Sequence, residues 1–264
     1  MRIAVVQVAA TADKAANLAK ARRMVAAAAA RRPHLIVFPE AFMYDFGDPH
    51  AALAPAAEPL DGPFVGSLTE LARTYRIGVI AGMFERSEDP DRAYNTVVAI
   101  TAEGDLAARY RKIHLYDSFG NRESDRLKGG ELEPAVAKMC GMGIGLLTCY
   151  DLRFPELARL LVASGAEVLA VPSAWMRGPL KEDHWETLLR ARAIENTCFV
   201  AGAGQCGPAY IGRSMIVDPM GVTVVGLASD EGFGVADVEP DRLAEIRERN
   251  PALEHQRFSV VASE

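Results

Sequence analysis

The segment 144–156 constrains the fold most, because it changes from an apolar strand to a helix across a single cysteine. Residues 144–147 are typical of a buried strand, and Pro155 suits the first turn of a helix, where its missing N–H costs nothing. Cys149 lies between them, near the positive end of the helix dipole, which favours the thiolate. The segment predicts a strand–turn–helix unit that presents a nucleophilic thiol, although a buried structural cysteine fits the same pattern.

The rest of the chain alternates between strand and helix patterns. The expected strands are 3–8, 35–38, 78–84, 96–101, one around Arg109, 144–147, 168–171, 198–203, 214–217, 223–225 and 235–238. The expected helices are 14–31, one around 67–75, 155–163, 183–195 and 241–249; capping-box spacing occurs at Ser67/Glu70 and Asp183/Glu186. Residues 115–139 are expected to be irregular. This mixture predicts an α/β layered protein, and without a linker or composition break we expect one domain over 1–264.

Composition excludes several classes of function. The net charge of -6 argues against a nucleic-acid partner. Four cysteines without Cys-x-x-Cys spacing and five scattered histidines indicate neither a zinc site nor another metal. The glycine run 141–145 precedes its strand and lacks Gly-x-Gly-x-x-Gly spacing, so no dinucleotide cofactor is expected. No apolar run approaches the roughly 20 residues that span a bilayer, and free thiols favour the cytoplasm.

Three polar residues stand where predicted strands end. Glu40 follows the strand 35–38, Lys112 lies in a segment of alternating apolar and charged residues, and Cys149 follows the strand 144–147. In an open α/β fold, chemistry is placed at the strand ends along one edge of a sheet. Together these residues would supply a base, a cation for a developing oxyanion and a nucleophile. An isolated Glu or Lys is more often an ordinary surface charge, so the flanking residues decide.

Those flanking residues resemble the nitrilase superfamily of carbon–nitrogen hydrolases over nearly the whole chain. The resemblance rests on the segments 38–40, 94–96, 110–115, 123–126, 148–156, 171–175, 184–185, 190–196 and 212–219. The segments 112–117 and 149–156 are most similar to the branch that contains ω-amidases and deaminated glutathione amidase. The resemblance implies a four-layer α-β-β-α sandwich, in which two sheets face each other with helices outside.

The resemblance also implies catalytic roles. Cys149 would attack the carbonyl carbon of an amide, while Lys112 and the backbone N–H of Tyr150 would hold the oxyanion. Glu40 would move the proton from the thiol to the leaving amine and then activate water. Glu123 would position Lys112 and the substrate. The alternative for Glu123 is a loop salt bridge with a neighbouring arginine.

Substrate contacts are less defined. Arg153 is a candidate for binding a substrate carboxylate, although a salt bridge with Asp151 or Glu156 is an equal alternative. Tyr44 and Trp175 could line the pocket or belong to the core. The chain departs from many relatives at Gly129-Gly130, where Pro-Gly is common, and the segment 43–49 matches no single subgroup.

The expected function is cysteine-dependent hydrolysis of a small linear amide, of the carboxylate-bearing ω-amide type, with release of ammonia through a thioester. N-carbamoyl amino acid hydrolysis and a catalytically silent binding or assembly subunit are the alternatives. Relatives associate through the helix after the nucleophile and the C-terminal segment. We therefore expect a homodimer or larger homo-oligomer, to which a strand-like tail at 258–262 would contribute.

Overall fold

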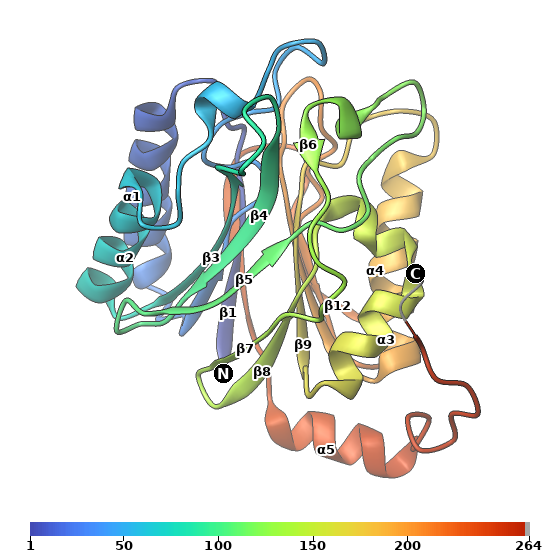
Figure 1. Ribbon diagram of the computed structural model, residues 1–264. Coiled ribbons are helices and arrows are strands. Elements are labelled where there is room, and N and C mark those ends of the chain that lie inside the picture. Colours follow the sequence, from blue (N-terminus) through green and yellow to red (C-terminus); the bar gives the residue numbers. More distant parts are fainter. Residues whose placement is uncertain (262–264) are drawn as a thin grey trace.

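The computed structural model describes residues 1–261 and shows two β-sheets packed face to face between helices (Figure 1). The first, seven-stranded sheet has the order β13-β1-β2-β3-β4-β5, with β6 paired to β4. Its strands are β1 (Arg2–Gln7), β2 (Leu35–Val37), β3 (Gly78–Glu85), β4 (Ala93–Ile100), β5 (Leu106–Arg111), β6 (Leu127–Lys128) and β13 (Gly232–Asp237). Together with the second sheet and the outer helices described next, this sheet confirms the predicted α-β-β-α sandwich.

The second, six-stranded sheet has the order β12-β11-β10-β9-β8-β7. Its strands are β7 (Val136–Met139), β8 (Met142–Leu146), β9 (Val168–Ser173), β10 (Phe199–Gly204), β11 (Met215–Val217) and β12 (Thr223–Gly226). β8, β9 and β10 are parallel, as are β1, β2 and β3 in the first sheet. An isolated parallel bridge between Val8 and Gln205 joins the ends of β1 and β10, so both parallel sets end on the same side of the sandwich.

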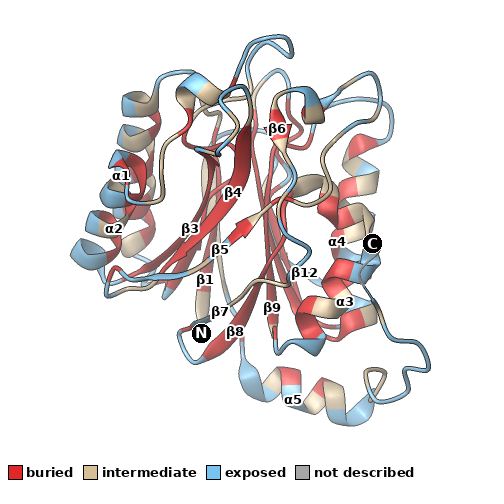
Figure 2. Ribbon diagram, in the orientation of Figure 1, coloured by how far each residue is buried: buried red, intermediate tan, exposed pale blue. Residues whose placement is uncertain are grey.

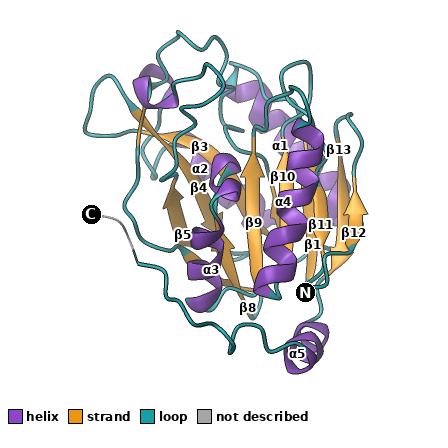
Figure 3. Cartoon of the chain, turned by 90° about the vertical axis from the view of Figure 1, so that its right-hand side faces the viewer, coloured by secondary structure: helices purple, strands orange, loops and turns teal. Residues whose placement is uncertain are grey.

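Helices cover the outer faces of both sheets. α1 (Lys14–Ala29) and α2 (Pro63–Tyr75) lie on the first sheet, and α3 (Pro155–Ala163) and α4 (Lys181–Asn196) lie on the second (Figures 1 and 3). α5 (Pro240–Arg249) lies below the layers in both views. Among residues 1–261, no helix has the length and apolar character needed to cross a membrane.

Strand periodicity explains the two cores. In β1, Ile3 and Val5 face the second sheet, whereas Ala4 and Val6 belong to the apolar cluster beneath α1 and α2. Successive strand residues point to opposite faces, and both faces of this sheet are covered by other elements. The central strands β1–β4 and β8–β11 are therefore buried on both sides, while the helices keep an exposed outer face (Figure 2).

Several predicted boundaries are wrong. α4 begins at Lys181 after Leu180, before the expected Asp183, whereas Ser67/Glu70 lies within α2 (Pro63–Tyr75), which ends at Tyr75 as predicted. The stretch 115–139 contains β6 and β7 as well as irregular chain. The described part of the expected tail strand, 258–261, is not a strand, and position 262 lies outside the described residues.

Candidate active site

Glu40, Lys112 and Cys149 converge on one cavity of about 150 Å³. Glu40 follows β2, Lys112 follows β5, and Cys149 follows β8. The walls are completed by two groups of side chains. One is cationic or acidic, comprising Arg122, Glu123, Arg126, Arg153 and Lys181; the other is largely aromatic or small, comprising Phe46, Gly47, Pro49, Tyr116, Asn121, Tyr150, Ala174, Trp175, Met176, Ala209 and Tyr210.

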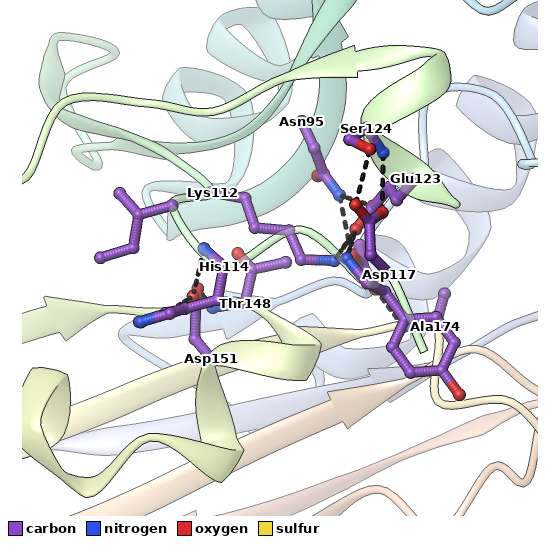
Figure 4. Close-up of polar contacts among 12 residues, drawn as sticks. Asn95, Lys112, His114, Asp117, Glu123, Ser124, Thr148, Asp151 and Ala174 are labelled. Atoms are coloured by element: carbon purple, nitrogen blue, oxygen red, sulfur yellow. Dashed lines mark hydrogen bonds and ion pairs between the residues drawn. The ribbon is translucent and has the colours of Figure 1, made fainter. Parts of the chain in front are cut away.

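Lys112 bridges two buried carboxylates (Figure 4). Its Nζ lies 3.0 Å from Oε1 of Glu40 and 2.8 Å from Oε2 of Glu123. Asn95, which the sequence analysis missed, donates from Nδ2 to Oε1 of Glu40 at 2.8 Å and to Oε1 of Glu123 at 3.3 Å. The N–H of Ala174 donates to Oε2 of Glu40 at 2.7 Å. Glu123 therefore contacts Lys112, and the alternative of a salt bridge to a neighbouring arginine is not what the structure shows.

Burial and neighbouring charges together shift the pKa values of Lys112 and Glu123. Burial acts to lower the pKa of Lys112, but the charges of Glu123, Glu40 and Cys149 outweigh it and raise that pKa well above its usual value. Burial raises the pKa of Glu123, and the charge of Glu40 adds to this effect, while Lys112 opposes it. One ammonium charge therefore balances only one of the two carboxylate charges. The remaining negative charge raises the proton affinity of the cluster, as is typical of residues that exchange a proton.

The backbone of Glu40 is held from two sides. A Cβ on Gly82 of β3 would lie 2.6 Å from the Cα of Glu40, so a larger residue at Gly82 would displace it. On the other side, Nε2 of Gln205 donates to the carbonyl of Glu40 at 2.9 Å. Ala41, directly after Glu40, has a φ of 51°, a left-handed conformation that only such surrounding contacts make tolerable.

Cys149 begins a short 3₁₀ helix, Cys149–Arg153, with a φ of 48°. This left-handed backbone is the sharp turn that the strand–turn–helix pattern predicted, and it places Cys149 on the cavity that Glu40 also lines. Cys149 is partly exposed as a residue, since it lines the cavity, yet protein surrounds its thiol. Burial, and then the charge of Glu40, raise the pKa of Cys149 well above its ordinary value. The expectation that the helix dipole favours a resting thiolate is therefore wrong.

A second buried network fixes the turn after Cys149. Asp151 accepts hydrogen bonds from Tyr110 Oη at 2.7 Å and from the N–H of Thr148 at 2.8 Å, both at Oδ2. Its Oδ1 pairs with Nδ1 of His114 at 2.7 Å (Figure 4). The His114 ring stacks on Phe154, with ring centroids 3.8 Å apart. Asp151 thus connects the strand before Cys149 to the first sheet, a role that sequence analysis did not assign.

Replacing Asp151 with asparagine is expected to lower the free energy of unfolding by about 3 kcal/mol, because an amide NH₂ would then face a donor that needs an acceptor. Chemical denaturation measures this loss. Asp117→Asn is the control: Asp117 also bonds a neighbour, Ser124, but lies on an exposed loop, so its replacement should cost less than about 1 kcal/mol. Equal losses in the two variants would contradict a supporting role for Asp151.

The cavity wall contains three of the four residues expected to contact the substrate, namely Tyr150, Arg153 and Trp175. Arg153 forms neither of the salt bridges considered for it; its guanidinium lies 4.9 Å from the centroid of Trp175, on the cavity wall. Tyr150 also lines the cavity, with its ring 5.0 Å from that of Tyr116. The structure does not place Tyr44 at the cavity, because that side chain packs against the apolar cluster beneath α1 and α2.

Tyr116, Lys181 and Tyr210 are among the wall residues that sequence analysis missed. Lys181 is the first residue of α4, and its Nζ donates to Tyr116 Oη at 3.0 Å. Tyr210 donates to Asp45 Oδ1 at 2.9 Å. Among residues 1–261, no group of three or more His, Cys, Asp or Glu side chains is arranged to hold a metal ion.

Comparison with known proteins identifies the family. Residues 2–248 match the family profile described as "Carbon-nitrogen hydrolase". Deaminated glutathione amidase of Escherichia coli O157:H7 is 42% identical over 238 residues, which is 89% of each chain. A CN-hydrolase superfamily protein of Xanthomonas campestris, solved with an arsenic adduct in its active site, is 29% identical with a TM-score of 0.88, and the match covers 99% of each chain.

A variant of the amidase from Nesterenkonia sp. AN1, in which acrylamide has added to the active-site cysteine, is 29% identical with a TM-score of 0.79. That match covers 94% of this chain and 97% of the other. The profile match over nearly the full length and the similarity to named amidases confirm the resemblance seen in the motifs. The chain belongs to the carbon–nitrogen hydrolase family of the nitrilase superfamily.

Proposed function

We propose that this hydrolase cleaves the amide C–N bond of a small linear amide that carries a carboxylate, with Cys149 as nucleophile. The observation that carries this proposal is the convergence of Glu40, Lys112 and Cys149 on one cavity. A nucleophile beside a base that other groups orient is the arrangement that covalent hydrolysis requires. An intact and costly cluster of buried charges also argues against a silent subunit.

Glu40 has the capacity to act as the base. A carboxylate offers about four lone-pair positions. Three are used by Lys112, Asn95 and the N–H of Ala174, and these three bonds fix the orientation of the side chain. The remaining position can accept the thiol proton of Cys149, which the raised pKa keeps in place until substrate arrives.

In the first half-reaction, the sulfur of Cys149 attacks the amide carbon as its proton moves to Glu40. The carbonyl electron pair moves to oxygen, where the positive charge of Lys112 and the N–H of Tyr150 stabilise the negative charge; a hydrogen-bond donor to an oxyanion contributes about 3–4 kcal/mol. The C–N bond then breaks, and Glu40 returns the proton to nitrogen. The products of this step are ammonia or an amine and a thioester on Cys149.

In the second half-reaction, Glu40 takes a proton from water, and the hydroxide attacks the thioester carbon. The C–S bond breaks, the carboxylic acid is released, and Glu40 returns the proton to sulfur. Glu123 holds Lys112 throughout, since its two oxygens lie 3.0 and 2.8 Å from Nζ. The site thereby returns to its starting protonation state.

The cavity supports an anionic substrate. Arg153 lines it without an acidic partner among residues 1–261, and Arg122, Arg126 and Lys181 add positive charge to walls that are otherwise largely aromatic or small. Several relatives are named deaminated glutathione amidase, and that substrate is an amide with carboxylates. A carboxylate-bearing ω-amide combines both features, whereas N-carbamoyl amino acids, the enzymatic alternative, would present a ureido carbon to the same three residues.

The test is a panel of four substrates: glutarate monoamide, deaminated glutathione, N-carbamoyl-β-alanine and butyramide. We expect the carboxylate-bearing amides to release ammonia or amine with a kcat/KM at least about 10-fold above that of butyramide. One charge-assisted hydrogen bond to the substrate carboxylate is sufficient for a factor of this size. Hydrolysis of the carbamoyl compound alone would favour the alternative, and no release from any of the four would contradict the proposal.

We also propose that the protein acts in the cytoplasm as a homodimer or larger homo-oligomer. Its four cysteines are free, as expected in a reducing compartment. Exposed apolar side chains gather where α4 meets the turn between β11 and β12, namely Ile194, Met220 and Val222. Light scattering of the purified protein would reveal a monomer if the assembly proposal is wrong.

A further inference from the structure

Lys181 is a buried cation on the cavity wall that the catalytic steps do not use. It is 6% exposed and is the first residue of α4. Its Nζ has one hydrogen-bond partner among residues 1–261, Tyr116 Oη at 3.0 Å, and it forms no salt bridge with any carboxylate in that range. An ammonium has three donors, so two remain for a ligand.

Three effects oppose a cation at this position, whereas the ring faces of Phe119, Tyr116 and Trp175 favour it. Burial removes water, a helix N-terminus carries partial positive charge, and Arg153 adds a second cation on the same wall. Burial and the charge of Arg153 lower the pKa of Lys181. Of the two acidic residues in the first turn of α4, Glu182 instead pairs with Arg177 at 3.8 Å. A bound anion would compensate all three unfavourable effects at once.

The surrounding residues hold Lys181 toward the cavity. Its carbonyl accepts a hydrogen bond from Trp175 Nε1 at 2.9 Å, which anchors the start of α4 to the cavity wall. A Cβ on Gly178 would lie 3.3 Å from Cγ of Lys181, so the bare glycine leaves room for the stem of the side chain. Aromatic rings surround Nζ, with Phe119 at 4.0 Å and Tyr116 at 5.3 Å from their centroids.

We propose that Lys181 binds the carboxylate of the substrate, beside Arg153, and thereby selects anionic amides over neutral ones. This inference rests on the proposed function and deepens it, because it assigns the specificity to a residue outside the catalytic cluster. The competing explanation is structural, namely that the hydrogen bond from Lys181 to Tyr116 serves only to fasten the loop that carries Tyr116 and Phe119. That loop also walls the cavity, so a fastening role would affect every substrate alike.

The test compares Lys181→Met, which keeps the apolar stem, and Lys181→Arg, which keeps the charge. For Lys181→Met, we expect kcat/KM for glutarate monoamide to fall about 10- to 100-fold, mainly through KM, because one charge-assisted hydrogen bond is lost. Hydrolysis of butyramide should change less than about 3-fold. Lys181→Arg should recover part of the loss. Arg177→Met removes an exposed cation that does not line the cavity, and it should leave both substrates unaffected.

Binding provides a readout that does not depend on turnover. Titration calorimetry of glutarate into Cys149→Ala should show about 10-fold or greater weakening when Lys181→Met is added. Equal losses for charged and neutral amides would overturn the inference in favour of a fastening role, and unchanged glutarate binding would overturn it outright. If wild type hydrolyses neither amide but glutarate binding still depends on Lys181, the proposed function fails and this inference stands.

Discussion

Replacing Cys149 with alanine is expected to reduce amide hydrolysis about 10⁴-fold or more, because no other group can form the thioester. The remaining activity would come from substrate binding and from oxyanion stabilisation by Lys112. Since Cys149 is held in a left-handed conformation, the variant keeps the same backbone strain, and we expect it to fold. The measurement is ammonia release from glutarate monoamide at saturating and at low substrate.

Cys198→Ala is the matched control. Cys198 is a buried free cysteine whose Sγ lies 3.7 Å from the carbonyl of Arg192, and it does not line the cavity. Its replacement should leave kcat/KM within about 3-fold of wild type, with a small loss of stability from the cavity created. Activity within 10-fold of wild type in Cys149→Ala, in a protein free of contaminating amidase, would contradict nucleophilic catalysis by this thiol.

The sequence was sufficient for the layered fold, and it singled out three residues that the structure places around one cavity. Glu40 and Cys149 stand directly after apolar strands, and ends of parallel strands on one side of a sandwich meet in space. Helix starts were harder to predict. The capping spacing at Ser67 occurs inside α2, which starts at Pro63 after Gly62; Gly62 has no side chain to cap the helix, and Glu58 Oε2 instead accepts from the N–H of Phe64 at 2.8 Å. Short polar residues favour caps but also occur within helices.

The missed residues depend on tertiary contacts. Asn95 could have been suspected, since an amide in the middle of a buried strand needs partners, but nothing local indicates that its partners are Glu40 and Glu123. Lys181 gave no signal, because Gly178 and Trp175 decide its direction. The pKa of Cys149 was predicted in the wrong direction: the helix dipole is visible in sequence, whereas burial and the approach of Glu40 are not.

Replacing Glu40 with glutamine should separate hydrolysis from thiol reactivity. Hydrolysis is expected to fall about 10³-fold, because an amide can neither take the thiol proton nor return it to the leaving amine. Alkylation of Cys149 by iodoacetamide at pH 8 should not slow and is expected to accelerate. After burial, the charge of Glu40 is what raises the pKa of the thiol, so its removal lowers that pKa and increases the thiolate fraction.

Glu123→Gln is the matched control, since it removes the same charge from the same cluster while leaving Glu40 in place. We expect a smaller loss of hydrolysis than in Glu40→Gln, and no acceleration of alkylation, because Glu40 still faces the thiol. Thermal unfolding must be measured for both variants, because glutamine at position 40 would destabilise the site in either orientation of its amide. Its NH₂ group would face Lys112 and Asn95 in one orientation and the N–H of Ala174 in the other, and all of these are donors. If alkylation and hydrolysis fall together in a folded Glu40→Gln protein, Glu40 is needed to form the thiolate itself, and the view that its charge holds the proton on Cys149 is wrong.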